Sequence, residues 1–528
     1  MSKTVAIIGA GPSGLAAIKN SLEAGLEPTA FEIDPWLGGA WRYTDLHEEK
    51  VRRSCVANST VTNTSKHLSC FSDFPMPKEW PNYLSRQKYL EYFQMYAKEF
   101  GLEKRIRFEA TVHAVEPTSA ETGRWRVSYR DQKNKEQVEE FDFVMVCSGV
   151  NWDPHVANIP GLDGFSGEVI HSREYRTWKN FEGKRVLVVG LGNSAADIAC
   201  ELSRHTPQVY LSTRSGSWVT SRLLGGDPLD TFLMRSTNVI PSAVRTQVFR
   251  YKLESNLNLV NFGLGVAQPP DKRFPIINDE LPHRIITGSI KVKSDIAEVQ
   301  GNVVHFTDGS KVEDIDVVIL AIGFKFSFPF LSDTLLCPTD KYIPLYKYVF
   351  PPSFNPGTLA IIGAIRVNGP VPPLCEIQSR WAASVFAGKT KLPDCQTMVE
   401  EIERRQQQLE ANTIKCCRAF HLVTFIGYLD EISSLIGAKP NLWQLLMTDP
   451  VLAFRCIFGP CLPAQYRLFG PGTWQGARDI IMGFEESKLC PLRTRKTSPK
   501  VNKVGWMNSR LPWVLGLLVV LILFLLVN

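Results

Sequence analysis

Two glycine-rich turns in the chain could each hold the phosphates of a dinucleotide. The first, with Gly9, Gly11 and Gly14, lies between an apolar run at 4–8 and apolar residues at helical spacing. In such a turn the first glycine permits a tight bend, the second lets the backbone approach a pyrophosphate, and the third lets helix and strand pack. The pattern predicts a strand, a phosphate-binding turn and a helix. The residues expected to contact the dinucleotide are Gly9, Ala10, Gly11, Pro12, Ser13 and Gly14.

An acidic residue follows this turn at the distance expected for a ribose contact. A second apolar strand, 28–31, ends at Glu32, which lies 18 residues beyond Gly14. A carboxylate there accepts hydrogen bonds from ribose hydroxyls, so Glu32 is expected to hold the ribose of the first dinucleotide. A glycine turn that arises by chance is the alternative, and the order of strand, turn, helix and acidic residue argues against it.

The second turn repeats this order with one change. Gly190, Gly192 and Ala195 follow an apolar run at 185–189, and the next strand, 208–211, leads to Arg214 instead of an acidic residue. A carboxylate there would repel a 2′-phosphate, whereas a guanidinium can bind one through two hydrogen bonds. We expect the second site to prefer NADP(H) over NAD(H), unless Arg214 is only a solvated loop cation. The expected contacts are Gly190, Gly192, Asn193, Ser194, Ala195 and Arg214.

The two turns together predict the domain organisation. One acidic and one basic dinucleotide fold imply an α/β protein with two Rossmann-like domains, an NADPH-binding domain being inserted into an FAD-binding domain. Apolar strands at 143–147 and 317–321, each followed closely by a glycine, mark where the chain would pass between them. We expect the FAD-binding domain at 1–154 and 326–445, the NADPH-binding domain at 155–325 with an insertion near 223–290, a membrane-associated region and basic linker at 446–510, and a single-pass transmembrane anchor at 511–527.

The anchor is predicted from hydropathy. Leu511 to Val527 is a run of 17 residues without a charge, which as a helix spans roughly 25 Å, the short end of what crosses a bilayer. A buried core helix is the alternative, but a core helix would show a polar stripe and this run has none. The apolar, Trp-containing stretch from Phe454 to Trp474 is a second candidate for membrane contact, lying on the bilayer surface.

Composition narrows the classes of protein that remain. The chain has 528 residues, 44% of them hydrophobic, which is enough for two or three folded domains. Its net charge of +6 comes from the C-terminus, because residues 487–528 hold seven basic residues and no acidic one. The nearly neutral remainder argues against a nucleic-acid partner, and neither the Cys nor the His residues form a metal-binding pattern.

The cysteines and the N-terminus indicate the compartment. Twelve Cys without CxxC pairs indicate a reducing environment. The first residues run directly into an apolar strand, with no signal-peptide pattern. Both features favour a body that faces the cytosol behind a C-terminal anchor.

Further motifs resemble a known family. Phe165, Gly167, His171 and Tyr175 match the FxGxxxHxxxY fingerprint of class B flavoprotein monooxygenases, just ahead of the second glycine turn. Segments 38–41, 62–66 and 459–474 resemble animal, microsomal flavin-containing monooxygenases in particular, and the similarity runs from residue 4 to the predicted anchor.

The resemblance implies an activity. In this family NADPH reduces FAD, the reduced flavin adds O2 at C4a, and the hydroperoxide passes an oxygen to an amine nitrogen or a sulfur. The protein has to hold two cofactors face to face and exclude water, without a catalytic triad. The implied partners are a small-molecule substrate, O2 and membrane lipid, in the endoplasmic reticulum membrane and in xenobiotic metabolism. Homo-oligomerisation is left open.

The resemblance also implies residue roles. Asn63 matches the family asparagine near the reacting atoms and is the expected catalytic residue, whereas an Asx turn is the reading without the resemblance. His171 and Tyr175 are expected to order the linker between domains. The further cofactor contacts are Gly39, Ala40, Trp41, Thr62, Asn63 and Thr64.

Departures from the family pattern leave the substrate open. The usual A-T-G-Y at the second crossing is Ala321-Ile322-Gly323-Phe324, and Arg366 stands where most relatives have Gln. A cation there would disfavour protonated amines, so a Baeyer–Villiger monooxygenase acting on ketones stays an alternative, as does an NADPH oxidase that releases H2O2. A disulfide reductase is strongly disfavoured because residues 32–54 contain no Cys, and a flavoprotein that only binds partners is also disfavoured.

Overall fold

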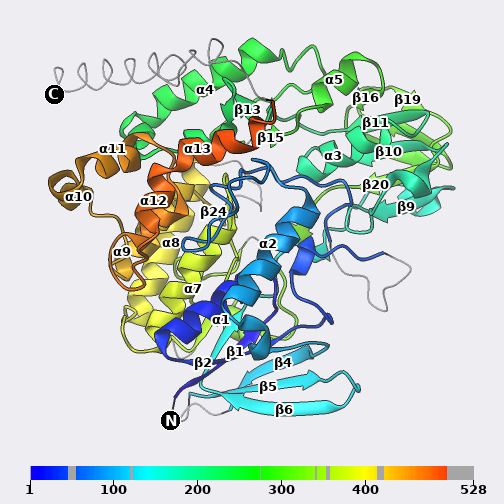
Figure 1. Cartoon of the computed structure of the whole chain (residues 1–528). Coiled ribbons are helices and arrows are strands. Elements are labelled where there is room, and N and C mark those ends of the chain that lie inside the picture. Colours follow the sequence, from blue (N-terminus) through cyan, green and yellow to red (C-terminus); the bar gives the residue numbers. More distant parts are fainter. Residues whose placement is uncertain are drawn as a thin grey trace.

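The computed structural model of the chain describes residues 2–45, 55–118, 123–273, 275–338, 342–352, 357–412 and 421–495. Figure 1 shows two parallel sheets at separate ends of this body, one around β1 and β2 and the other around β10, β11 and β20. The C-terminal helices α7 to α9 and α12 lie on the side of the first sheet.

The first sheet is built from the N-terminal turn and its neighbours. Its five strands pair in parallel in the order β22, β7, β1, β2, β3. Side chains alternate along β1, so Val5 and Ile7 pack with the helices while Ala6 and Ile8 pack on an antiparallel sheet of β4 to β6. The elements are β1 (Thr4–Ile8), α1 (Pro12–Ala24), β2 (Glu27–Phe31), α2 (Arg86–Glu99), β3 (Ile106–Arg107), β4 (Thr111–Pro117), β5 (Trp125–Arg130), β6 (Glu136–Phe141), β7 (Phe143–Val146), β22 (Leu359–Ile361) and α7 (Pro372–Phe386).

The second sheet repeats this plan. Its strands pair in parallel in the order β16, β11, β10, β20, β9. Val186 and Val188 face helix α3, and Leu187 and Val189 face the antiparallel strands β17 to β19. The elements are β9 (Glu168–His171), β10 (Arg185–Val189), α3 (Asn193–Leu202), β11 (Gln208–Ser212), α5 (Leu281–Ile286), β16 (Ile290–Lys293), β17 (Ile296–Gln300), β18 (Val303–Phe306), β19 (Lys311–Val312) and β20 (Val317–Leu320).

The chain passes between the sheets twice, and the two crossings touch. Strands β8 (Asp153–Pro154) and β21 (Phe324–Lys325) pair antiparallel, with Pro154 opposite Phe324. The insertion expected near 223–290, with the residues just before it, folds as short strands, α4 and the helix α5 given above. These elements are β12 (Val219–Thr220), β13 (Leu223–Leu224), β14 (Asp227–Pro228), α4 (Ser242–Asn256) and β15 (Ile276–Ile277).

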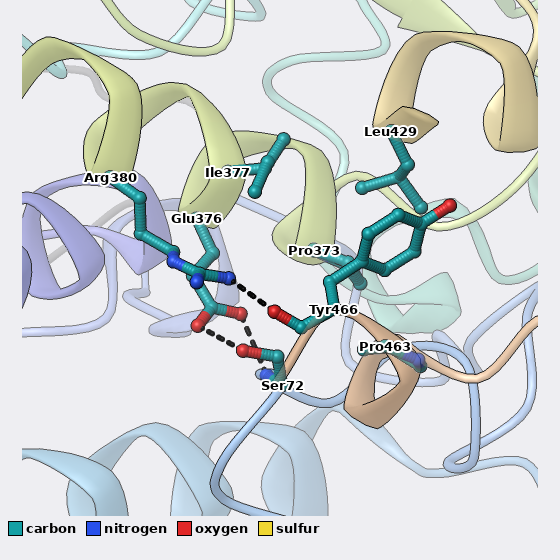
Figure 2. Close-up of a pocket in the computed structure, with 8 residues that line it drawn as sticks. All are labelled: Ser72, Pro373, Glu376, Ile377, Arg380, Leu429, Pro463 and Tyr466. Carbon is teal, nitrogen blue, oxygen red and sulfur yellow. Dashed lines mark hydrogen bonds between the residues drawn. The ribbon is translucent and has the colours of Figure 1, made fainter. Parts of the chain in front are cut away.

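The C-terminal part is mostly helical and is attached to the first sheet's layer. In the short turn η8 (Pro463–Arg467), Arg467 is buried and contacts Glu376 of α7 at 2.8 Å and Asp73 at 2.8 Å. Figure 2 shows the small pocket beside this contact, where Ser72 donates to Glu376 and Arg380 donates to the Tyr466 carbonyl. The elements are α6 (Asp333–Leu336), β23 (Arg366–Val367), α8 (Cys395–Asn412), β24 (Leu422–Val423), α9 (Phe425–Leu435), α10 (Leu442–Thr448), α11 (Pro450–Phe458), α12 (Ala477–Met482) and α13 (Phe484–Leu489).

The predicted anchor, 511–527, lies outside the described residues. Within the ranges described, the structure has no helix that is both long and apolar enough to span a membrane.

Candidate functional site

The first glycine turn packs as its spacing predicts. Gly9 has φ +107°, and a Cβ there would lie 2.7 Å from the carbonyl oxygen of Cys147 at the end of β7. A Cβ on Gly14 would lie 1.9 Å from the carbonyl oxygen of Gly9. The turn therefore holds β1, β7 and the start of α1 at distances that admit no side chain.

The N-terminus of α1 opens toward the predicted 38–41 contact segment. A Cβ on Gly11 would lie 3.5 Å from the Cα of Gly39, so two glycine backbones face each other. Gly38 donates its N–H to the carbonyl of Ala10 at 3.1 Å, which fixes this approach. No side chain caps α1, whose N-cap is Gly11. Uncapped N–H groups bordered by glycines fit the pyrophosphate of a dinucleotide.

Glu32 lies at the end of β2 beside the same turn. Its side chain is buried and accepts the N–H of Ala10 at 2.7 Å and that of Asp34 at 3.0 Å. These bonds hold the carboxylate against the turn, where a ribose following the pyrophosphate would lie. Ser13, on the first turn of α1, faces Gly363 after β22, since a Cβ on that glycine would lie 3.2 Å from the Ser13 Oγ.

The second turn has matching geometry. Gly190 has φ +108°, and a Cβ there would lie 2.5 Å from the carbonyl oxygen of Ala321 at the end of β20. Its N–H donates to the carbonyl of Ser212 at 3.0 Å, as the N–H of Gly9 donates to Phe31 at 2.8 Å. No side chain caps α3, and a Cβ on its N-cap, Gly192, would meet nothing within 4 Å.

The two other predicted side chains of this turn differ in their surroundings. Asn193 uses its Oδ1 to accept the N–H of Ile277 at 2.9 Å, so it ties the turn to β15 of the insertion. Arg214 is exposed, and within the described part of the chain its guanidinium has no hydrogen-bond or ion-pair partner. Arg273 donates to the Ser215 Oγ at 2.7 Å and adds a second cation to this loop. Two cations beyond β11 fit a bound 2′-phosphate.

In the segment around Asn63, the two threonines bond other protein groups and Asn63 itself is partly accessible. Thr62 is buried, and its N–H and hydroxyl pair with the backbone of Leu84 at 2.8 and 2.9 Å. The Thr64 hydroxyl pairs with Ser69 at 2.7 Å. Both predicted contacts thus use their hydroxyls inside the protein, and Asn63 is the half-buried side chain between them.

The hydrogen bond that would define an Asx turn at Asn63 is replaced by another. In such a turn the Asn Oδ1 accepts the N–H two residues on, which here belongs to Ser65. Ser65 donates that N–H to Asp230 at 2.6 Å instead, and the Asn63 Oδ1 accepts from Arg222 at 2.9 Å. Asn63 is therefore held by another side chain rather than by its own turn.

Arg222 and Asp230 both lie near the start of the insertion. No sequence motif identifies either residue as a contact of the segment around Asn63. Arg222 is 159 residues from Asn63 in sequence, and Asp230 is 165 from Ser65. Burial raises the pKa of Asp230 to about 6. Only the folded chain brings these residues to the 61–66 segment.

The fingerprint residues contact neighbouring elements. Tyr175 is buried and donates to Glu201 of α3 at 2.9 Å, and Ser59 donates to the same carboxylate oxygen at 2.8 Å. The His171 ring packs edge-on against Phe324 of β21, 5.2 Å between centroids, and burial lowers its pKa. These contacts favour the structural interpretation, in which both residues order the crossing between the sheets.

Two of the departures from the family pattern lie together. Arg366 donates to the carbonyl of Phe324 at 3.5 Å, and its guanidinium lies 5.1 Å from the ring centroid of Phe326. The cation is thus at the second crossing, between the two sheets. In the described ranges no group of three or more His, Cys, Asp or Glu could hold a metal ion.

The whole sequence is similar to a family of flavin-dependent enzymes. The model of a family described as flavin-binding monooxygenase-like matches residues 2–528. Dimethylaniline monooxygenase (N-oxide-forming) 2 of Rattus norvegicus is 43% identical over 534 residues, covering 99% of each chain. Flavin-containing monooxygenase 5 of the same species is 44% identical, covering 93% of this chain and 94% of that one.

Solved structures agree on the fold. S-allyl-L-cysteine S-oxygenase from Allium sativum superposes with a TM-score of 0.63 at 25% identity, covering 86% of this chain and 95% of that one. Cyclohexanone monooxygenase from Rhodococcus sp. Phi1, bound to NADP+, has a TM-score of 0.59 at 17% identity, covering 83% and 98%.

Proposed function

The chain belongs to the flavin-binding monooxygenase-like family, and from that premise we propose that it oxygenates the nitrogen or sulfur atom of small molecules with NADPH and O2. One oxygen atom enters the substrate, and the other leaves as water with the hydride equivalent from NADPH and one proton from solvent. Two similar proteins support this proposal, namely the N-oxide-forming dimethylaniline monooxygenase and the S-allyl-L-cysteine S-oxygenase. FAD, when bound, supplies the redox chemistry.

One observation carries the assignment of the two cofactors. The matching turns differ in the residue that comes after their second strand, buried Glu32 in one and exposed Arg214 in the other. Residues 1–154 and 326–445 would hold FAD, with Gly11 and Gly39 bordering its pyrophosphate and Glu32 its ribose. Residues 155–325 would hold NADPH over Gly192, with Arg214 at the 2′-phosphate. Asn63 would donate its amide N–H near the reacting atoms.

The purified full-length protein tests this proposal directly. We expect flavin absorbance that bleaches with NADPH, and an N-oxide or sulfoxide product when an amine or a sulfide is added in air. Bleaching with product formation supports the proposal. A flavin that NADPH does not reduce contradicts it.

A Baeyer–Villiger reaction on ketones is the second candidate, favoured by Arg366. Its cation at the second crossing would repel a protonated amine and would stabilise negative charge developing on a carbonyl oxygen. Parallel assays with a sulfide and a cyclic ketone separate the candidates. Ester formed faster than sulfoxide would favour the second, and release of H2O2 alone would indicate an oxidase.

Selectivity for NADPH should depend on Arg214. One charge-assisted contact to a phosphate is worth roughly 1.5–3 kcal/mol, so Arg214→Ala should lower the preference for NADPH over NADH about 10- to 100-fold. The measurement is the rate of flavin reduction against each nucleotide. Arg245→Ala, at an exposed arginine of α4, is the control and should leave the preference unchanged. An unchanged preference in Arg214→Ala would refute the assignment.

Membrane attachment belongs to the same proposal. The anchor at 511–527 would insert in the endoplasmic reticulum membrane and leave the body in the cytosol. In the surface stretch expected at 454–474, residues 460–467 are buried, whereas Phe454 is 47% exposed and continues an exposed apolar face that begins earlier, on α10 and α11. There Trp443 is 81% exposed, Met447 85% and Val451 56%. In a chain that carries an anchor, such a face fits the lipid headgroup boundary.

Truncation before Leu511 should therefore leave the protein partly membrane-bound. Each of these large side chains contributes about 1.5–3 kcal/mol when buried, so the truncated chain should stay with membranes in high salt. Adding Trp443→Glu and Met447→Glu should release it. Val138→Glu, at an exposed valine of β6, is the control and should not. Release of the truncated chain by salt alone would show that charge holds it.

A further inference from the structure

We infer that Arg222 is a positioning residue that fixes the orientation of the Asn63 amide from across the domain crossing. This inference rests on the proposed function, because it takes Asn63 as the side chain nearest the reacting atoms. It assigns to the start of the insertion a role in the chemistry.

The contacts of Arg222 converge on the 61–63 backbone. Its Nε donates to the Thr62 carbonyl at 3.0 Å, and its Nη2 donates to the Val61 carbonyl at 3.2 Å and to the Asn63 Oδ1 at 2.9 Å. One planar guanidinium thus holds two consecutive carbonyls and the side chain that follows them. A lysine presents its three donors from a single nitrogen and lacks the planar arrangement of two separate donor nitrogens used here.

These contacts determine which end of the Asn63 amide is available. A guanidinium only donates hydrogen bonds, so the amide atom that faces it must be the oxygen. The Asn63 Nδ2 is then directed away from Arg222 and is free to donate. A donor is the group that can stabilise negative charge appearing on a cofactor or on oxygen. Without Arg222 the two amide orientations would be nearer in energy.

Arg222 is itself held on two sides. Its Nη1 donates to the Asp279 Oδ2 at 2.6 Å, and its backbone N–H donates to the Asp279 Oδ1 at 2.8 Å. Its carbonyl accepts from the Tyr83 hydroxyl at 2.6 Å. The Arg222 side chain is only 14% exposed. Asp279 lies just before α5 and Tyr83 just before α2, so elements of both halves of the molecule hold Arg222, Asp279 through the guanidinium and Tyr83 through the backbone carbonyl.

The test is a double-mutant cycle of Arg222→Ala and Asn63→Ala in the full-length protein. We measure substrate oxygenation and the H2O2 released per NADPH oxidised, together with FAD content. Loss of one charge-assisted hydrogen bond corresponds to about 10- to 100-fold, so each single variant should oxygenate substrate that much more slowly and release more H2O2. FAD content should not change. Because Arg222 acts through Asn63, the double variant should match Asn63→Ala within about twofold.

Two further variants and a second readout separate positioning from general damage. Arg222→Lys should recover only part of the product formed per NADPH oxidised, because lysine keeps the positive charge and lacks the planar guanidinium. Arg204→Ala removes the exposed ion pair with Glu280, the residue next to Asp279, and should change nothing. Amide hydrogen exchange within residues 59–66 should rise in Arg222→Ala and not in Arg204→Ala.

The outcomes distinguish this inference from the proposed function. If the unaltered protein oxygenates no substrate, the proposed function fails. If the unaltered protein oxygenates substrate and Arg222→Ala does so at the same rate, the inference alone is overturned. It is also overturned if the effects of Arg222→Ala and Asn63→Ala on the rate multiply in the double variant.

Discussion

Gly14→Ala should abolish FAD binding. The added methyl carbon would lie 1.9 Å from the carbonyl oxygen of Gly9, a backbone atom at the end of β1, and the methyl group itself would be fixed to the first turn of α1. The turn or the helix has to shift, at a cost beyond the roughly 1–3 kcal/mol typical of overpacking. Because this shift occurs at the predicted pyrophosphate contact, we expect protein that purifies without flavin or does not fold. FAD absorbance per chain and soluble yield are the measurements.

A matched glycine separates this effect from the general cost of replacing glycine. Gly164, in an exposed short turn, has no atom within 4 Å of an added Cβ and no positive φ. Gly164→Ala should keep full FAD content and yield. A Gly14→Ala protein that retained one FAD per chain would contradict the predicted role of the turn.

Arg467→Met should destabilise the protein by about 3–5 kcal/mol, the usual cost of breaking a buried ion pair. Arg467 contacts Glu376, Asp73 and the hydroxyl of Ser72, the last at 2.6 Å. Burial alone would raise the pKa of Glu376, but Arg467 and Arg380 hold it below its ordinary value, so this carboxylate is ionised. Removing the cation leaves that charge buried. The measurement is the free energy of unfolding in detergent, with flavin fluorescence as the probe of the transition.

Two comparisons isolate the cause. Arg478→Met removes an exposed ion pair with Asp449 nearby in the chain, and it should change the unfolding transition little. Adding Glu376→Gln to Arg467→Met removes the unpaired charge and should restore part of the stability. A small loss in Arg467→Met would show that the C-terminal segment does not depend on this contact.

The sequence predicted the parts of the molecule that depend on local chain geometry. Glycine spacing at Gly9 and Gly190 identified both turns because a tight bend between strand and helix has few solutions. The crossings were expected after the apolar strands at 143–147 and 317–321, and the chain after these strands forms β8 and β21, which pair with each other. The domain boundaries placed around them and the individual cofactor contacts stay predictions.

Other parts could not be predicted because they depend on contacts between distant residues. Nothing in the Thr62 to Lys66 segment indicates that Arg222 would bind Asn63, or that the hydroxyls of Thr62 and Thr64 would be used inside the protein. The start of the exposed apolar face was not predicted for a similar reason. Apolar residues from 460 to 466 are covered by packing against the helical layer, while Trp443, Met447 and Phe454 are not.

The proposed reaction transfers one oxygen atom from O2 to a soft nucleophile and consumes one NADPH. The most direct measurement supplies ¹⁸O2 to the full-length protein with NADPH and a sulfide, and counts label in the product against NADPH oxidised. We predict close to one labelled sulfoxide for each NADPH oxidised, with little H2O2. NADPH consumption that yields only H2O2, or a sulfoxide without label, would contradict it.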